Sequence, residues 1–512
     1  MPSRDCDSCN RRDLIAGRFE PRTERSPKPT RASPHPRSHA QGCSARAFRA
    51  IGDAALKSLL FASFAQKRCA GEWIGIGVPG AAIALLLSCV AHAQDAVPAV
   101  SGSSANYPVT PPPPAPLVET SPATEPNVQP AESIAPQPYS PQPRRFQYGL
   151  LFRVRGVYDD NINISQVNPI SDYYFAIEPT VTVGVGDVFE QQENYLRLDF
   201  TPSVFFFLDH SGEDAVQHLV RLEGHHRFGR LDLSLRQDIQ VLDGADLAGT
   251  NDITITGNFA NLDVSTRTRV NIFTTQLQAA YELTGKTSLS SRFESTITDY
   301  PDFISSQVIS GNLFVNYAYS EKVTVGLGGT AGYDFVDEPD PDQTFEQANL
   351  RLSYQASGKL SFNASGGVEF RQFEHSSRGT YISPVFEVDG TYQPFEATSF
   401  SLAISRRTLN SAVLVDQDFA FTTVSLGARQ RLFQRVYLGF NIGYQNSDYF
   451  STITGLNANR NDDYYFVQPA LDVMITRFWS VGGYYLHRQD DSSVDAFSFD
   501  NNQVGFRTVL TF

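Results

Sequence analysis

The residues of this chain that could perform acid–base or nucleophilic chemistry are few and scattered. From residue 146 onward the histidines are His210, His218, His225, His226, His375 and His487. Asp209–His210 and His225–His226 are neighbours in sequence, but a catalytic site also needs a nucleophile and an orienting group within hydrogen-bond reach. Neither a Gly-x-Ser-x-Gly nor a His-Glu-x-x-His motif occurs. The sequence therefore predicts a protein that is not an enzyme and has no catalytic or cofactor-binding residues.

Metal ligands are equally sparse. Oxygen-bearing side chains cluster in Tyr158-Asp159-Asp160-Asn161-Ile162-Asn163, a composition that suits a hard cation such as Ca²⁺. EF-hand spacing is missing, however, and Asp and Asn also form turns at strand ends. Cys6 and Cys9 have the spacing of a zinc knuckle, but no second pair follows. We therefore predict neither a metal site nor a cofactor.

The N-terminal region has the features of export targeting. Residues 1–65 are polar, rich in Arg and without periodicity, which indicates a disordered extension and a mis-assigned translation start. Residues 66–93 contain Lys67 and Arg68, an apolar run and then Ala91-His92-Ala93, which is the pattern of a cleaved signal peptide. A transmembrane helix and a lipoprotein signal at Cys89 are the alternatives. Cleavage after Ala93 would remove all five cysteines, which suits an oxidising periplasm.

A proline-rich segment follows the predicted signal. Residues 94–145 contain 14 of the 30 prolines, and Ser, Ala, Thr and Gln fill most of the rest. Such a composition cannot bury a hydrophobic core and favours an extended, disordered chain. We predict a periplasmic linker here, either a simple tether or a segment that contacts peptidoglycan or another periplasmic partner.

From residue 146 to residue 512 the sequence alternates with a period of two. Val323, Val325, Leu327, Ala331, Tyr333 and Phe335 fall on one face of a strand, and Thr324, Gly326, Gly328, Thr330, Gly332 and Asp334 fall on the other. Similar alternation recurs at 231–241, 360–371, 399–405 and 436–445. Strands of about 9–11 tilted residues cross a bilayer, and an apolar outer face with a polar inner face is typical of a transmembrane β-barrel.

Turn spacing gives the predicted topology. Short turns at 284–286, 320–322, 357–359, 395–397, 433–435 and 477–478 alternate with longer segments at 243–268, 336–344, 409–418 and 448–463. This pattern predicts an all-β, up-and-down antiparallel barrel of about 18 strands, with 16 as the alternative. The expected strands are 146–158, 173–186, 193–208, 215–228, 230–242, 271–283, 287–299, 307–319, 323–335, 345–357, 360–373, 381–393, 398–408, 419–432, 436–447, 464–476, 479–490 and 500–512.

Charge and the chain end indicate an orientation. From residue 94 onward the lysines are Lys286, Lys322 and Lys359, all in short turns, whereas the longer segments are acidic. Short periplasmic turns and long extracellular loops are typical of bacterial barrels. The chain alternates to its last residue, Phe512, as outer-membrane proteins do, which implies recognition by the barrel-assembly machinery. Residues 146–512 hold 25 basic against 44 acidic residues, and this balance disfavours nucleic acid as a partner.

The barrel region also resembles a known family. Its first strand ends in Tyr158-Asp159-Asp160-Asn161, and repeated hairpins with Thr-x-Lys-Thr or Glu-Lys turns lead to a terminal Phe. These features are similar to the beta-barrel porin 2 family of proteobacterial outer-membrane proteins. The resemblance implies the barrel fold and an outer-membrane location contacting lipid and lipopolysaccharide, and some relatives accompany exopolysaccharide export genes.

Two functions remain open from the sequence. A barrel of this size encloses a lumen wide enough for water, so the first function is a passive channel for hydrophilic solutes. Such a channel could also serve polysaccharide export. The acidic loops predict a weak cation preference. The second is a structural or adhesive barrel plugged by its own loops, above all by 243–268. A sugar path inside the lumen would require inward aromatic residues, for which Tyr437 and Tyr485 are the candidates.

Overall fold

The structure, a computed structural model, describes residues 146–512 except 187, 190–193, 245–261 and 265. The described residues form the strands β1 (Phe146–Asp159), β2 (Asp172–Gly186), β3 (Tyr195–Phe207), β4 (Ala215–Phe228), β5 (Leu231–Gly244), β6 (Thr268–Glu282), β7 (Thr287–Asp299), β8 (Ser306–Ser320), β9 (Val323–Val336), β10 (Gln343–Ser357), β11 (Leu360–Phe373), β12 (Tyr381–Phe395), β13 (Thr398–Asn410), β14 (Gln417–Leu432), β15 (Val436–Ser451), β16 (Asn461–Met474), β17 (Trp479–Ser492) and β18 (Phe499–Thr511). Two short 3-10 helices, η2 (Ser211–Glu213) and η4 (Asp495–Phe497), follow β3 and β17. Within the described ranges, no helix is long and apolar enough to cross a membrane.

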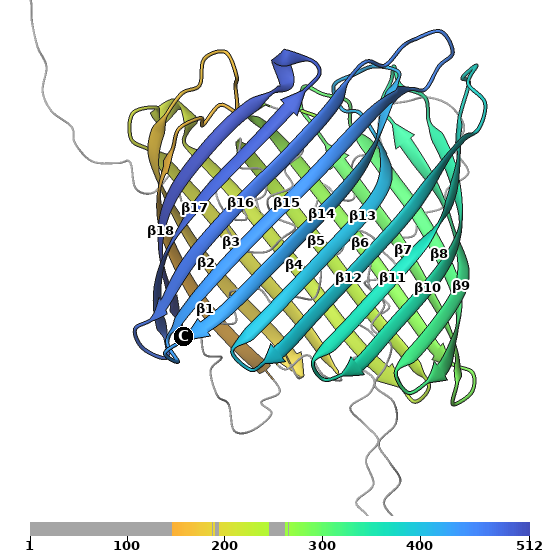
Figure 1. The fold of residues 1–512 in the computed structure, drawn as a ribbon, viewed down its shortest axis with the longest axis horizontal. Helices are drawn as coiled ribbons and strands as arrows, with labels where there is room; N and C mark the ends of the chain where they lie inside the picture. The colour runs from red at the N-terminus through yellow and green to blue at the C-terminus, as the bar shows by residue number, and fades with distance from the viewer. Residues whose placement is uncertain (1–145, 187, 190–193, 245–261, 265) are drawn as a thin grey trace, which may run out of the picture. The chain divides into compact units, whose positions relative to one another are not determined.

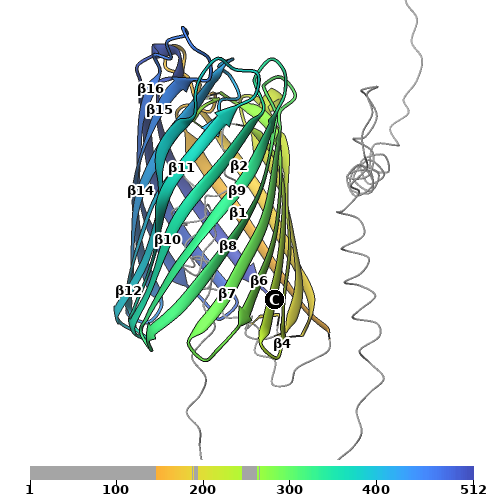
Figure 2. The same cartoon turned by 90° about the vertical axis from the view of Figure 1, so that its right-hand side faces the viewer.

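The strands form one closed antiparallel sheet. Each strand pairs with its neighbours in sequence, and β1 pairs with both β2 and β18. Along the closing seam Leu151 lies opposite Thr511 and Asp159 lies opposite Gln503. Leu150 and Phe512 exchange two backbone hydrogen bonds at the end of this seam. Figures 1 and 2 show the tilted strands on two sides of the barrel. The predicted 18-stranded barrel is confirmed, and the alternative of 16 strands is wrong.

The strand bounds follow the alternation of the sequence closely. All predicted strands are present, and their ends shift by no more than four residues; the largest shift carries β15 to Ser451. The extensions lie mainly at the ends that lead into the long connections, as for β14 and β16. Strand pairing there continues beyond the length that periodicity alone suggests, because neighbouring strands provide the backbone partners.

Strand β9 shows how the two faces are used. Its outward residues Val325, Leu327 and Phe335 are 42%, 65% and 40% exposed. On the inward face the Phe345 ring lies so close to Gly332 that a Cβ there would be 2.2 Å from the ring. The glycine therefore leaves room for an aromatic side chain of the adjacent strand β10, and the apolar outward face predicted for this strand is confirmed.

The two ends of the barrel differ. Short turns join β6 to β7, β8 to β9 and β10 to β11 at the lower edge in Figure 1, and longer connections lie at the upper edge. Three register shifts, next to Ser320, Ser357 and Phe395, all lie beside short turns. The chain therefore has a turn end and a loop end, as predicted.

The predicted extension 1–65, signal peptide 66–93 and proline-rich linker 94–145 lie outside the described residues. The predictions for these three segments stay predictions.

Candidate functional site: the barrel interior

The outer surface of the barrel is apolar across its middle and aromatic at both ends. Exposed aliphatic side chains in the middle of strands include Val181, Leu198, Leu277, Leu313, Val315, Leu327, Leu350, Leu426, Ile442 and Leu471. Exposed aromatic rings near the turn end are Phe146, Tyr148, Tyr281, Tyr317, Tyr319, Tyr392, Phe395, Phe433, Phe478, Trp479 and Phe512. At the loop end they are Tyr173, Phe175, Phe206, Phe335, Phe370, Tyr465 and Tyr485. This is the surface of a barrel that spans a bilayer between two aromatic girdles.

The inner surface is polar, and several of its charges are paired. Arg155 and Glu178 form a bidentate pair at 3.0 and 2.7 Å on β1 and β2. Arg507 on β18 binds Asp472 on β16 at 2.9 and 2.7 Å. This second pair crosses β17, where Gly482 makes room: a Cβ there would lie 2.0 Å from Asp472 Oδ1. Such pairs keep the wall polar, and each charge in a pair offsets the desolvation of the other.

Charged side chains from distant strands also interact electrostatically across the interior. Glu387 on β12 interacts electrostatically with Arg407 on β13, Arg292 on β7 and Arg351 on β10. Glu294 on β7 interacts with Arg292, Arg407 and Arg236. Because β7 and β13 are six strands apart in the sheet, these side chains reach over the lumen toward one another. We call Arg292, Glu294, Arg351, Glu387 and Arg407 the charged waist.

Residues 262–264, which lie between β5 and β6, are bound to the opposite wall of the barrel. Ser411 Oγ donates to Asp263 Oδ1 at 2.8 Å, the Ala412 amide donates to Oδ2 at 2.5 Å, and Tyr449 Oη donates to Oδ1 at 2.9 Å. Ser411 and Ala412 directly follow β13, and Tyr449 lies near the end of β15; these strands are seven to nine strands away around the sheet from β5 and β6. We call residues 262–264 the strap.

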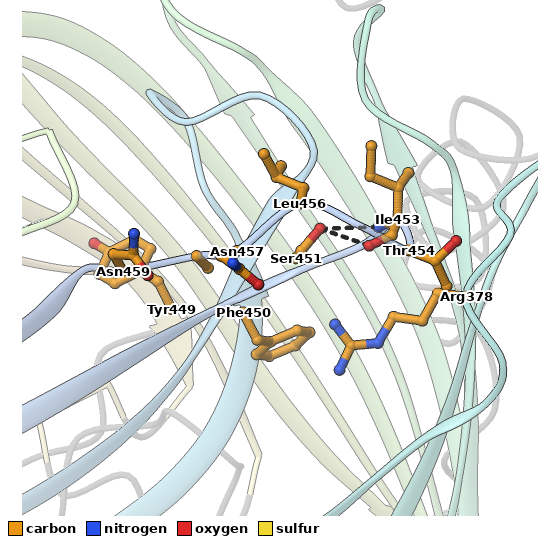
Figure 3. A pocket seen from close by; sticks show the side chains of 10 residues that line it. Arg378, Tyr449, Phe450, Ser451, Ile453, Thr454, Leu456, Asn457 and Asn459 are labelled. Atoms are coloured by element: carbon orange, nitrogen blue, oxygen red, sulfur yellow. Dashed lines mark hydrogen bonds between the residues drawn. The ribbon is translucent and has the colours of Figure 1, made fainter.

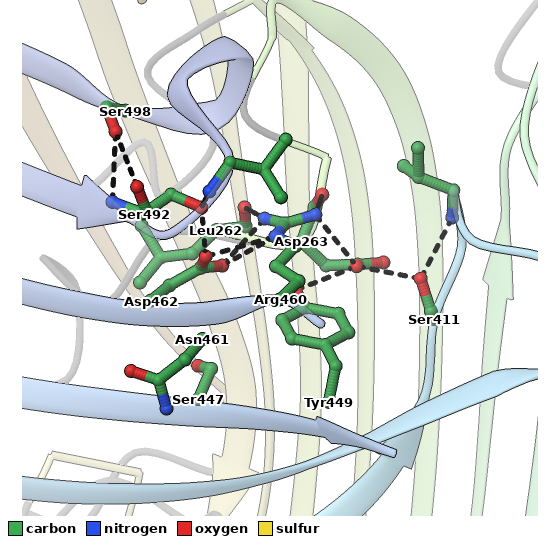
Figure 4. Close-up of polar contacts among 12 residues, drawn as sticks. Leu262, Asp263, Ser411, Ser447, Tyr449, Arg460, Asn461, Asp462, Ser492 and Ser498 are labelled. Carbon is green, nitrogen blue, oxygen red and sulfur yellow. Dashed lines mark hydrogen bonds and ion pairs between the residues drawn. The ribbon is translucent and has the colours of Figure 1, made fainter. Parts of the chain in front are cut away.

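Arg460, which directly precedes β16, holds the strap from a second side. Its Nη1 and Nη2 donate to the backbone oxygens of Asp263 and Leu262 at 3.0 and 2.9 Å. Its Nη2 also pairs with Asp462 at 2.7 Å. Figure 4 shows the guanidinium between Asp462 on one side and the strap on the other. Arg460 is 3% exposed, so it links the wall and the strap in a largely dry environment.

Apolar packing reinforces these polar contacts. Leu262 is 3% exposed and packs in a cluster that lies on the inner face of β1–β4 and β16–β18. Its other members are Val157, Ile164, Tyr174, Ala176, Phe205, Ala215, Tyr464, Phe466, Ala470, Tyr484, Leu486 and Phe499. Val264 packs in a second cluster with Leu242, Val270, Tyr300 and Ala412. The interior is therefore partly filled by protein on the side where the strap docks.

Burial raises the carboxyl pKa of two acids in this region. The carboxyl pKa of Asp263 is raised above its ordinary value because the group is desolvated, and the Arg460 charge and three hydrogen-bond donors only partly offset this effect. Burial also raises the pKa of Asp340, in the β9–β10 loop, to about 6. Asp340 Oδ1 accepts a hydrogen bond from the Asp416 amide at 2.7 Å, which links two connections at the loop end.

The predicted inward aromatic residues are half right. Tyr437 lies on the inner face, with the Arg429 guanidinium 4.8 Å from its ring centre. The expectation for Tyr485 is wrong: it is 41% exposed on the outer face, and its neighbour Tyr484 is the inward residue at 5%. In the pair Tyr173–Tyr174 the buried inward residue is Tyr174, and in the pair Tyr464–Tyr465 it is Tyr464. A strand sends adjacent residues to opposite faces, so a Tyr-Tyr pair supplies one ring to each.

The other candidate residues are used within the protein. Asp159 Oδ1 accepts hydrogen bonds from the Asn161 amide and Asn501, and its Oδ2 accepts one from Gln503. The oxygen cluster at 158–163 thus ties β1 to β18, which the sequence did not indicate. His210 contacts Asp172 at 3.0 Å, and His225 contacts Asp232. Among the described residues, no group of three or more metal-ligating side chains is arranged to hold an ion.

Comparison with known proteins finds distant structural similarity. No family model matches the chain and no curated protein matches it. Solved structures similar to it include a loop L8 deletion mutant of OmpT from Vibrio cholerae, with 14% identity, 72% of this chain and 100% of that chain covered, and a TM-score of 0.31. OpdK of Pseudomonas aeruginosa with vanillate has 10% identity, with 72% of this chain and 99% of that chain covered and a TM-score of 0.36. OccAB4 of Acinetobacter baumannii has 8% identity, with 73% of this chain and 100% of that chain covered and a TM-score of 0.37.

The class of the protein follows from its own surfaces. A closed barrel with an apolar belt, two aromatic girdles and a polar interior satisfies all backbone groups in lipid without a sheet edge. The chain is an integral β-barrel protein of the bacterial outer membrane.

Proposed function

We propose that the protein is a passive, porin-like channel for hydrophilic solutes. The observation that carries this proposal is the charged waist: three arginines and two glutamates of β7, β10, β12 and β13 interact electrostatically across the lumen. Charged side chains that line a lumen select permeating solutes by charge. Apolar residues would fill this level of the barrel if the interior served only as a packed core.

Recording in planar bilayers tests this function. We expect the purified protein to give steady, ohmic single-channel currents. The acidic residues at the loop end, such as Asp337, Asp340 and Asp342, raise the local cation concentration, so we also expect a weak cation preference in a salt gradient. A reversal potential that indicates anion selectivity would contradict the second expectation and leave the first intact.

The alternative is a structural or adhesive barrel closed by its own loops. A specific observation favours it: the strap crosses to the opposite wall and packs in two interior clusters. The strap belongs to segment 243–268, the segment that the sequence predicts to plug the barrel. Conductance separates the two functions, because a closed barrel gives no steady open state in either polarity.

The finer assignments extend this proposal. Membership of the beta-barrel porin 2 family, and with it a link to exopolysaccharide export, is supported by the Tyr158-Asp159-Asp160-Asn161 strand end and the repeated hairpins. Deletion of the gene followed by quantification of surface polysaccharide tests the link. Unchanged polysaccharide in the deletion strain argues against it.

Three partners belong to the same proposal. Phe512, 59% exposed, is the residue that the barrel-assembly machinery would read. The outward belt contacts lipid, with lipopolysaccharide at the loop end. Residues 94–145 would reach periplasmic or peptidoglycan partners, and affinity capture with that segment tests this contact.

A further inference from the structure

A pocket lies at the loop end of the barrel. It is a hollow of about 380 Å³ between Arg378 in the β11–β12 loop and residues 449–451, 453–454 and 456–459 at the end of β15 and in the β15–β16 connection. The two loops are joined, since Ser376 Oγ donates to the Thr452 oxygen at 2.5 Å and the hydroxyls of Ser377 and Thr454 lie 2.5 Å apart. The volume is at the lower end of the roughly 300–1,000 Å³ of small-molecule sites.

Arg378 is held in place by aromatic rings. Its guanidinium carbon lies 4.9 Å from the Phe450 ring centre, 5.0 Å from that of Tyr381 and 6.0 Å from that of Phe373. Figure 3 shows the side chain extended toward Phe450. Rings cover the faces of a guanidinium by cation–π contact and leave its N–H edge for hydrogen bonds. The arginine is therefore fixed before a ligand arrives.

The rest of the lining determines which ligand fits. Arg378 is the only charged side chain among the ten described residues that form the pocket, although the neighbouring loops are acidic. Asn457 and Asn459 add amide groups, and Ile453 and Leu456 add apolar surface. The combination provides a bidentate site for an anionic group, hydrogen-bond donors and acceptors for hydroxyls, and an apolar surface for C–H groups.

We propose that this pocket binds a sugar acid, with its anionic group on Arg378 and its hydroxyls on Asn457 and Asn459. The sugar acid is either a free monosaccharide or the terminal residue of a surface polysaccharide. This inference goes beyond the channel function, because binding at the loop end does not require conduction through the lumen.

Titration calorimetry on the full protein in detergent tests the proposal with galacturonate, galactose, inorganic phosphate and a galacturonate trisaccharide. We expect galacturonate to bind, and galactose and phosphate to bind at least about tenfold more weakly, a difference of about 1.4 kcal/mol. Arg378→Gln should lose at least tenfold in affinity, and Arg378→Lys should lose less because the charge remains without the bidentate edge. The source is the polysaccharide if the trisaccharide binds more tightly than the monosaccharide, and the free sugar if it binds more weakly.

The control is Arg477→Gln, which removes an exposed arginine from the turn between β16 and β17. Asn457→Ala is the second variant, and it should reduce galacturonate binding without changing phosphate binding. Each variant is first checked for the mobility shift on heating that folded barrels show in gels. The proposal is overturned if galacturonate does not bind, if Arg378→Gln binds it as well as the unchanged protein, or if phosphate binds equally tightly.

Discussion

At the scale of single residues, the most consequential contacts of this protein join segments that are far apart in sequence. Arg460 binds backbone oxygens of Leu262 and Asp263, almost 200 residues earlier in the chain. It also lies 3.6 Å from the Phe497 ring centre and 4.5 Å from that of Tyr449. A buried arginine with this many partners fixes the position of the strap in the lumen.

We predict that Arg460→Gln releases the strap. Removing one partner of a buried ion pair costs about 3–5 kcal/mol, and two strap oxygens lose their donors. Single-channel conductance should therefore rise above that of the unchanged protein. Arg477→Gln, in a turn at the other end of the barrel, should leave conductance unchanged. Equal conductance of Arg460→Gln and the unchanged protein would show that the strap does not limit flow.

Asp263 makes strap docking depend on pH. Its pKa is raised by burial in the docked state, so the docked state binds a proton more tightly than a released one. The docking free energy is then most favourable below the ordinary Asp pKa of about 4 and weakens as pH rises through the raised value. We expect conductance to be greater at pH 8 than at pH 4. Asp263→Asn, which does not titrate, should reduce this difference, and an undiminished difference would assign it to other groups.

Periodicity could not predict the strap contacts. It assigns each residue to a face of its own strand, and it correctly placed Tyr437 inside. Asp263 lies outside any strand, and its partners Ser411 and Tyr449 are identified only once the sheet has closed. The error at Tyr485 has a simpler cause. A shift of one residue moves a side chain to the opposite face of the strand, so the two residues of a Tyr-Tyr pair are easily exchanged.

At the scale of strands, alternation was a reliable guide because lipid and water impose opposite requirements on the two faces. It failed where the inner face is apolar. Phe205, Phe466 and Leu486 occupy inward positions that the polar rule assigns to hydrophilic residues. The sequence does indicate this apolar inner face. Tyr464 and Phe466 stand two residues apart on one strand, and Tyr484 and Leu486 do so on the next, at positions that face inward.

We predict that a charge on the lipid face destabilises the barrel and that the same charge on the lumen face does not. Leu327, 65% exposed in the middle of β9, should lose about 2–4 kcal/mol of folding free energy on substitution by Lys. Thr330→Lys, on the inward face of the same strand, is the matched control. Urea-induced unfolding from lipid vesicles measures both. Comparable losses would mean that β9 does not face lipid as described.

The last strand provides a separate prediction about assembly. Phe512 stacks on Phe478 with ring centres 6.5 Å apart, at the edge of the seam between β1 and β18. Phe512→Ala removes little buried surface because the ring is 59% exposed. The variant should therefore refold in detergent like the unchanged protein, yet reach the outer membrane in smaller amounts when expressed in cells. Normal amounts in isolated membranes would argue against recognition of this residue.

At the scale of the whole barrel, solute flow requires a continuous aqueous path past the strap and through the charged waist. The ion pairs of the wall keep its surface polar, the waist sets the charge that a solute meets, and the strap narrows one side of the lumen. These three features are compatible with flow only if the packed cluster around Leu262 leaves the opposite side open.

Single-channel recording of the purified protein in a planar bilayer measures whether this path is open. If it is, we expect discrete, steady openings for the unchanged protein and larger openings for Arg460→Gln. A protein that inserts into the bilayer, shows the heat-dependent mobility of a folded barrel and yet conducts no current, with or without the Arg460 substitution, would contradict it.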